Sequence, residues 1–157
     1  MADVRTNIFG IGEVYELQRE GQWVEKNRES YREYGYFGGS ASPVSSTVDR
    51  IDYSNDTATA SIRGPLSLAR GSFAATGNSN FGYFGGGSIP AVVSCSTVDR
   101  IDYSNDSAQA SPRGPLSISA FSSVATGNSN FGYWSGGGST SPSVNTSYTQ
   151  RIDYSND

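Results

Sequence analysis

A repeated unit of about 50 residues constrains the fold of this chain more than any other feature. Residues 46–67 recur at 96–117 with 19 of 22 positions identical. The string ATGNSNFGY occurs at 75–83 and 125–133, and RIDYSND occurs three times, the last time at 151–157. Repeats of this length form arrays in which each unit packs against its neighbours. We therefore expect a single repeat domain rather than several unrelated domains.

Each unit has the pattern of four short strands without a helix. A turn-forming Gly-Asn-Ser-Asn separates the first two predicted strands, and Asn-Asp separates the last two. Pro112 restricts the fourth strand of the second unit to an edge or an end. Four short strands per repeat are typical of a propeller blade. In the most complete unit we predict strands at 72–76, 81–84, 98–103 and 108–113.

Variation between the units is concentrated in one segment. The distance from Gly39 to Arg50 is 11 residues, and the corresponding distances are 14 and 15 residues in the next two units. Surface loops tolerate such insertions and often carry binding residues, so these segments are candidate recognition loops. Neutral drift of a solvated loop is the alternative. The loops are 40–47, 87–97 and 137–149, and their candidate ligand-facing residues are Pro43, Val44, Ile89, Val92, Ser143, Asn145 and Tyr148.

The N-terminal segment 1–34 differs in composition from the repeats. It holds 12 of the 26 charged residues of the chain. Spaced apolar residues among helix formers predict a short, partly helical amphipathic element. It is expected to act as an attachment segment or as a cap over the first blade. Its predicted partner-binding anchors are Phe9, Ile11, Tyr15, Trp23 and Val24.

Composition excludes several classes of function. The chain has no His and one Cys, so the usual zinc ligands and the usual general base are missing. A net charge of −4 argues against nucleic-acid binding, and no apolar run is long enough to span a membrane. The repeated Asp49, Asp52 and Asp56 are expected to be surface charges, with Asn55-Asp56 forming a turn. The repeated arginines are expected to pair across strands or blades. We predict no catalytic residue, no metal site and no cofactor.

The pattern resembles two known groups. A strand ending in paired glycines at 83–86, a variable loop, and the strand Val98-Asp99-Arg100-Ile101-Asp102-Tyr103 resemble a Kelch repeat, although Ser107-Ala108 stands near the usual tryptophan position. More specifically, GYFGGG, STVDRIDYSND, RGPLS and ATGNSN together resemble a repeat of tailed bacteriophages, marine and cyanobacterial ones especially, where it occurs in virion structural and tail-fibre-like proteins. The resemblance covers about residues 34–157 and implies a virion component rather than an activity.

These inferences combine into one expectation. The chain is all-β, with Kelch-like β-propeller-type repeats that supply about two and a half blades (about 35–70, 71–120 and 121–157), whereas a propeller needs about 4–8. Either copies pool their blades in a homo-oligomer, with a trimer favoured over a dimer, or the protein is longer.

The expected function is a non-enzymatic virion structural protein on the phage particle surface, assembled in the host cytoplasm and bound to other virion proteins. A host-receptor or glycan-binding adhesin is the first alternative, and a glycan hydrolase is the second.

Overall fold

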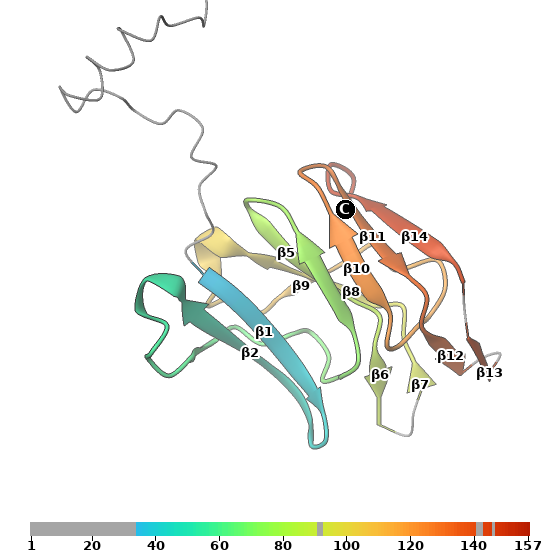
Figure 1. Cartoon of the computed structure of the whole chain (residues 1–157), viewed down its shortest axis with the longest axis horizontal. Coiled ribbons are helices and arrows are strands. Elements are labelled where there is room, and N and C mark those ends of the chain that lie inside the picture. The colour runs from blue at the N-terminus through green and yellow to red at the C-terminus, as the bar shows by residue number, and fades with distance from the viewer. Residues whose placement is uncertain (1–33, 91–92, 141–142, 146) are drawn as a thin grey trace, which may run out of the picture. The chain divides into compact units, whose positions relative to one another are not determined.

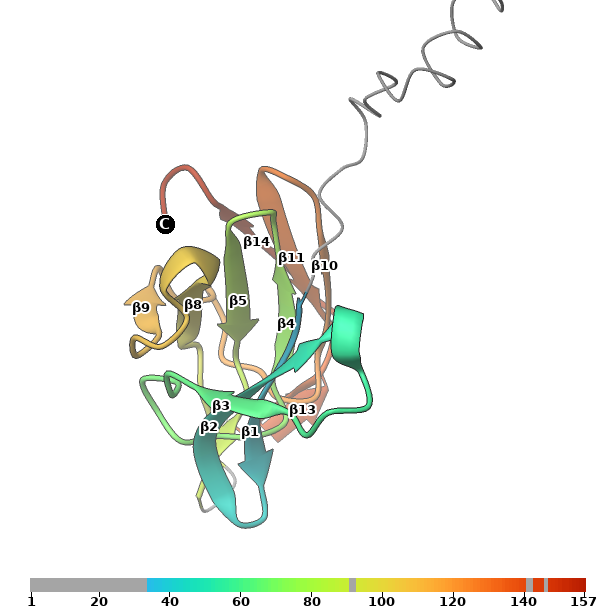
Figure 2. The same ribbon diagram turned by 90° about the vertical axis from the view of Figure 1, so that its left-hand side faces the viewer.

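The computed structural model describes residues 34–90, 93–140, 143–145 and 147–157, and this part of the chain is all-β (Figures 1 and 2). Its only helices are two single 3-10 turns, η1 (Tyr53–Asn55) and η2 (Tyr103–Asn105). No helix in the described ranges has the length and apolar character needed to cross a membrane. The predicted helical segment with its five anchors, and Val92 in the second variable segment, lie outside the described residues.

The repeats form three antiparallel sheets, each built from strands in chain order. Sheet 1 contains β1 (Tyr34–Ala41), β2 (Val44–Asp52) and β3 (Ser61–Arg63). Sheet 2 contains β4 (Ala74–Gly77), β5 (Phe81–Gly85), β8 (Val98–Asp102) and β9 (Ser111–Arg113). Sheet 3 contains β10 (Val124–Gly127), β11 (Phe131–Ser135) and β14 (Thr149–Asp153). The four strands of sheet 2 match the number expected for a complete unit, and sheets 1 and 3 have three strands each.

Local signals account for most strand ends. The Asn78 side chain accepts hydrogen bonds from the backbone N–H groups of Asn80 and Phe81, which closes the predicted turn between β4 and β5. Pro112 lies in β9, which pairs only with β8 within the described ranges and is therefore an edge strand, as proline requires. Gly86 adopts a φ of 71° directly after β5, a conformation that glycine reaches without steric cost.

The variable segments contain more structure than loops, so the loop prediction is wrong in this respect. The first continues the β1–β2 pair into a hairpin whose tip is Ser42–Pro43. The second forms the hairpin β6 (Ser88–Ile89) and β7 (Val93–Ser94). The third forms the hairpin β12 (Gly138–Thr140) and β13 (Ser143–Asn145). Very short strands have no periodicity that the sequence could reveal.

Two apolar clusters hold the three sheets together. Between sheets 1 and 2, Val48 and Leu66 pack with Phe84 and Ile101. The cluster between sheets 2 and 3 uses the equivalent positions one repeat later: Val98, Leu116, Trp134 and Ile152. The core is therefore a repeated interface between neighbouring sheets, and each sheet contributes different residues to the interfaces on its two sides.

Candidate functional site: hairpin rim and sheet junctions

The three hairpins from the variable segments lie at one end of the three-sheet unit, the lower end of that unit in Figure 1. We call them the hairpin rim: the tip of β1–β2, the pair β6–β7 and the pair β12–β13. The second and third hairpins are joined directly, since the Ser94 N–H donates to Thr140 Oγ1 at 3.0 Å and the Thr140 N–H donates to Ser94 Oγ at 3.1 Å. The variable segments of the second and third repeats thus form a continuous surface.

The predicted ligand-facing residues occupy this rim, but they differ in exposure. Pro43, Ser143 and Asn145 are exposed, whereas Val44 and Ile89 are half-buried. Tyr148 follows β13 and is 59% exposed. Sequence reasoning missed two exposed apolar side chains nearby, Val93 and Val144. These valines alternate with serine in strands of only two and three residues. A pattern this short does not distinguish a strand from a loop in the sequence.

A charged cluster fastens sheet 1 to sheet 2. The Asp106 carboxylate accepts hydrogen bonds at Oδ2 from Arg50 Nη1 at 2.8 Å and from Tyr36 Oη at 2.9 Å. Arg63 Nε lies 3.4 Å from the same oxygen. Asp106 is 8% exposed, so the prediction of a surface charge is wrong for this residue. The arginines do pair across sheets, as expected from the sequence.

The same cluster fastens sheet 2 to sheet 3. Asp157 accepts from Arg100 Nη1 at 3.0 Å and from Tyr83 Oη at 2.7 Å, and Arg113 Nε lies 3.8 Å away. Every participant is the repeat equivalent of one in the first cluster. The final aspartate of RIDYSND therefore contacts the tyrosine and two arginines of the preceding repeat. The sequence does show that the tyrosine, the two arginines and the aspartate recur together in the repeat. That these side chains contact one another cannot be read from the sequence, because the contact depends on how consecutive sheets pack.

Stacked tyrosines complete each junction. Tyr36 stacks on Tyr103 with ring centroids 4.9 Å apart, and Tyr83 stacks on Tyr154 at 4.3 Å. Burial, together with the neighbouring Asp106 carboxylate, raises the pKa of Tyr36 to about 12. Burial and Asp157 likewise raise the pKa of Tyr83. Both phenols therefore remain protonated donors at neutral pH.

The first aspartate of the second RIDYSND strand follows a different pattern. Asp102 accepts from both the backbone N–H and the hydroxyl of Ser104, and these hydrogen bonds lower the pKa of its carboxyl. Asp52 and Asp153 make the same contacts with Ser54 and Ser155. These carboxylates cap the turn that follows each strand, a role that the sequence analysis did not assign to them. They do not pair with the neighbouring arginines at hydrogen-bonding distance.

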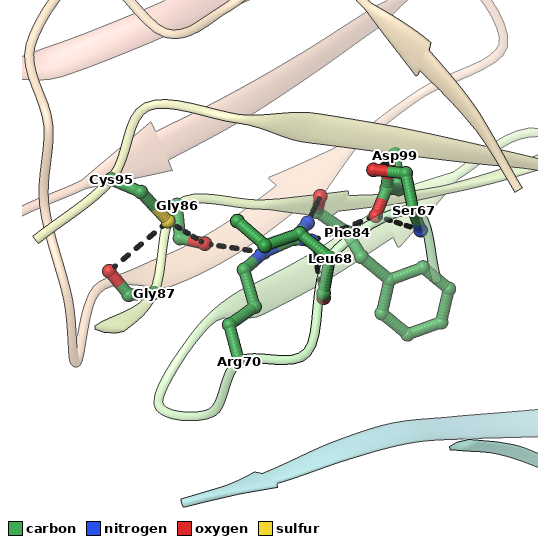
Figure 3. A network of polar contacts seen from close by, with 8 residues as sticks. All are labelled: Ser67, Leu68, Arg70, Phe84, Gly86, Gly87, Cys95 and Asp99. Atoms are coloured by element: carbon green, nitrogen blue, oxygen red, sulfur yellow. Dashed lines mark hydrogen bonds and ion pairs between the residues drawn. The ribbon is translucent and has the colours of Figure 1, made fainter. Parts of the chain in front are cut away.

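A fully buried ion pair anchors the linker that leads into sheet 2 (Figure 3). Arg70 Nη1 lies 2.7 Å from Asp99 Oδ2, and both side chains are 0% exposed. Arg70 also donates to the carbonyl oxygens of Leu68, Phe84 and Gly86, while Asp99 accepts from the N–H and hydroxyl of Ser67. Nearly all polar atoms of the pair are thereby satisfied, which is what burial of two charges requires.

The linker that leads into sheet 3 is held by the equivalent residues, but without charges. Gln150 stands where Asp99 does, and its Oε1 accepts from the Ser117 hydroxyl and from the Ile118 N–H. Ala120 stands in the position of Arg70 and is also buried. Both charges are thus replaced together, which leaves no unpaired ion in the interior. This places Arg70 and Asp99 in the scaffold rather than at a reactive centre.

Within the ranges that the structure describes, no group of three or more carboxylate or Cys side chains is placed to hold a metal ion. Cys95 donates weakly to the carbonyl oxygens of Gly86 and Gly87, and burial raises the pKa of its thiol (Figure 3). A thiol with a raised pKa is a poor nucleophile at neutral pH.

Comparison with known proteins finds similarity at the level of the fold. No family model matches the chain, and no curated protein matches its sequence. The solved structure of YjhT is similar, with a TM-score of 0.62 over 74% of this chain and 11% sequence identity. This chain matches 39% of the YjhT chain, so it spans much less than the whole of that protein. At this identity the similarity shows that the all-β repeat domain shares the fold of part of YjhT.

Proposed function

We propose that this protein is a non-enzymatic structural component of a tailed bacteriophage particle, a Kelch-like propeller-type scaffold that presents the hairpin rim outward. One observation carries the proposal. The strands and junctions are similar in successive repeats, while the length varies only in the hairpins and the sequence varies most there, and those hairpins gather at one end. A constant framework with variation gathered at one end is the arrangement expected of a scaffold that displays a variable surface.

The propeller-type architecture is supported by the order of the strands. Each sheet is a meander, and its neighbours in the chain are its neighbours in space, as in blades arranged around an axis. About two and a half blades per chain and a homo-oligomer that pools them remain part of this proposal, with segment 1–34 binding other virion proteins.

The contacts that the acidic side chains make support a scaffold rather than a hydrolase. Asp99, Asp106 and Asp157 hold linkers and junctions together. Asp52, Asp102 and Asp153 cap turns, and the hydrogen bonds that they accept lower the pKa of their carboxyls. A glycosidase needs one carboxyl with a raised pKa facing another across a single pocket.

Electron microscopy of gradient-purified particles, labelled with gold-conjugated antibody raised against this chain, tests the virion assignment. We expect labelling at one fixed position on each particle, and none with antibody pre-absorbed on the purified protein. Recovery of the protein solely from particle-free fractions would contradict the proposal.

A glycan- or receptor-binding adhesin is the second candidate, and the exposed apolar side chains on the rim favour it. Tyr148, Val93 and Val144 are 59%, 46% and 49% exposed, and a flat aromatic ring can stack on a sugar face. A glycan array probed with the wild type and with Tyr148→Ser tests this candidate. Binding that the substitution abolishes would support an adhesin, whereas absence of binding by the wild type would favour a purely architectural role.

A further inference from the structure

Sheet 1 presents an apolar face that its repeat equivalents bury. Phe37 is 58% exposed, whereas the equivalent Phe84 and Trp134 are 3% and 0% exposed. Tyr53 is 59% exposed, whereas the equivalent Tyr154 is 8% exposed. We call this surface, made of Phe37, Tyr53 and Asp56, the open face of sheet 1. In sheets 2 and 3 the corresponding surface packs against the preceding sheet.

Asp56 on this face already has the geometry of its paired equivalent. It follows η1 with φ −72° and ψ −9°, and Asp106 follows η2 with φ −73° and ψ −2°. Asp56 is nevertheless exposed, and no described side chain pairs with its carboxylate. The backbone therefore holds a carboxylate ready for the tyrosine and arginine contacts that Asp106 and Asp157 make.

Sheet 3 presents the complementary residues. Tyr133 and Arg151 are equivalent to Tyr36 and Arg50 of sheet 1, and Arg151 is exposed. The Arg151 guanidinium stacks on the Phe131 ring at 4.8 Å, just as Arg50 stacks on Tyr34 at 4.0 Å and Arg100 on Phe81 at 4.3 Å. These stacks pre-orient each arginine, and no described carboxylate pairs with Arg151. We call this surface, made of Tyr133, Thr149 and Arg151, the open face of sheet 3.

We propose that the open face of sheet 1 binds the open face of sheet 3 of a second copy of this chain, and that this contact reproduces the junction found twice within one copy. Asp56 then accepts from Tyr133 and Arg151, Tyr53 stacks on Tyr133, and Phe37 is buried. The occupant is a second copy because one chain carries both the aspartate side and the tyrosine–arginine side of the junction, with matching charge.

The proposed junction departs from the internal ones in two ways. No described residue of sheet 3 is equivalent to Arg63 or Leu66, which lie in the junction between sheets 1 and 2, and one core position differs as well. Thr149 stands where Val48 and Val98 lie fully buried, and its hydroxyl contacts that of Ser135 at 3.0 Å. The junction between copies is consequently less apolar than those within a copy, and dissociates more readily than sheets 1 and 2 separate. Because the contact is head-to-tail, it either closes into a ring or extends into a filament. Two copies of three sheets each fall within the roughly 4–8 blades of closed propellers, whereas three copies exceed that number. We therefore expect a ring of two copies rather than the trimer favoured from the sequence.

This inference rests on the oligomeric part of the proposed function and is independent of its virion part. Charge exchange tests it on the full chain. Asp56→Arg and Arg151→Asp each place like charges across the junction, so each variant alone should sediment as a monomer at concentrations where the wild type is an oligomer. In a mixed dimer, one junction carries the exchanged pair and the other is wild type. Mixing the two variants should therefore restore the oligomer.

Ser79→Lys, on the exposed turn between β4 and β5, is the control for altered charge and should sediment as the wild type does. Far-UV circular dichroism verifies that each variant is folded, as expected for changes at exposed positions. An oligomer that both charge variants retain would overturn the proposed surfaces but leave the proposed oligomer intact. A wild type that is monomeric at every concentration would overturn both, and gold labelling of particles would still decide the virion assignment.

Discussion

Replacing the buried pair of sheet 2 with its uncharged counterpart from sheet 3 should cost no more stability than either single change alone. Asp99→Gln leaves the Arg70 guanidinium buried without its counter-ion, and Arg70→Ala leaves the Asp99 carboxylate with only Ser67 as partner. Breaking one side of a buried pair costs about 3–5 kcal/mol. The sum of the two single changes is therefore about 6–10 kcal/mol if they act independently.

The double variant leaves no charge in the interior. It reproduces the combination of Ala120 and Gln150, in which a glutamine side chain accepts from the linker backbone. The remaining cost is the loss of donors to three carbonyl oxygens, at about 1 kcal/mol each. We expect the double variant to lose about 3 kcal/mol, which corresponds to a coupling of at least about 3 kcal/mol between the two positions.

Urea unfolding of the full chain at pH 7, followed by far-UV circular dichroism, measures the four free energies of this cycle. Ala120→Ser, a small change at a position without the ion pair, serves as a control for general sensitivity of the linkers. If the losses in free energy of unfolding were additive, the double variant would be less stable than either single variant. That result would refute the reasoning that each buried charge is stabilised by the other.

Two further predictions follow from the junction between sheets 1 and 2. A Cβ on Gly64 would lie 1.8 Å from the Ala108 carbonyl oxygen, whereas a Cβ on the equivalent Gly114 meets nothing within 4 Å. Gly64→Ala should therefore destabilise the protein by about 1–3 kcal/mol or more, and Gly114→Ala by less than about 0.5 kcal/mol, in thermal or urea unfolding; equal effects would contradict the packing described. Because the pKa of Tyr36 is raised to about 12, the folded state retains a proton that the unfolded state releases near pH 10. The stability contributed by this phenol is complete below about pH 10 and is lost as the pH rises toward 12. The urea midpoint should fall less between pH 9 and pH 11 in Tyr36→Phe than in the wild type, and an unchanged pH dependence would argue against the contact with Asp106.

The strands were predictable because their signals are local. Asn78 and the glycines mark turns, and alternation around Ile101 marks a strand, so the sequence alone indicates the four strands of the complete unit. The two small hairpins were not predictable, since strands such as Ser88–Ile89 are shorter than any period. Their contact with each other through Ser94 and Thr140 depends on the packing of neighbouring sheets.

The roles of individual charges were less accessible to sequence reasoning. Asp56 and Asp106 lie in the same sequence context, yet Asp106 is buried in a junction and Asp56 is exposed. Phe37 and Phe84 occupy equivalent positions in the repeat, yet Phe37 is 58% exposed and Phe84 is 3% exposed. A repeat shows which residues are equivalent, but the neighbouring sheet decides which of the equivalents is buried.

The central claim is that one junction holds the repeats together and is used twice within the chain. Paired double-mutant cycles test it most directly, one with Arg50→Ala and Asp106→Ala and the other with Arg100→Ala and Asp157→Ala. The two arginine side chains are 21% and 19% exposed, and the two aspartates 10% and 6%, so the pairs lie in similar surroundings. We predict coupling energies of about 1–2 kcal/mol that agree to within about 0.5 kcal/mol. A clear coupling at one junction and none at the other would contradict the account.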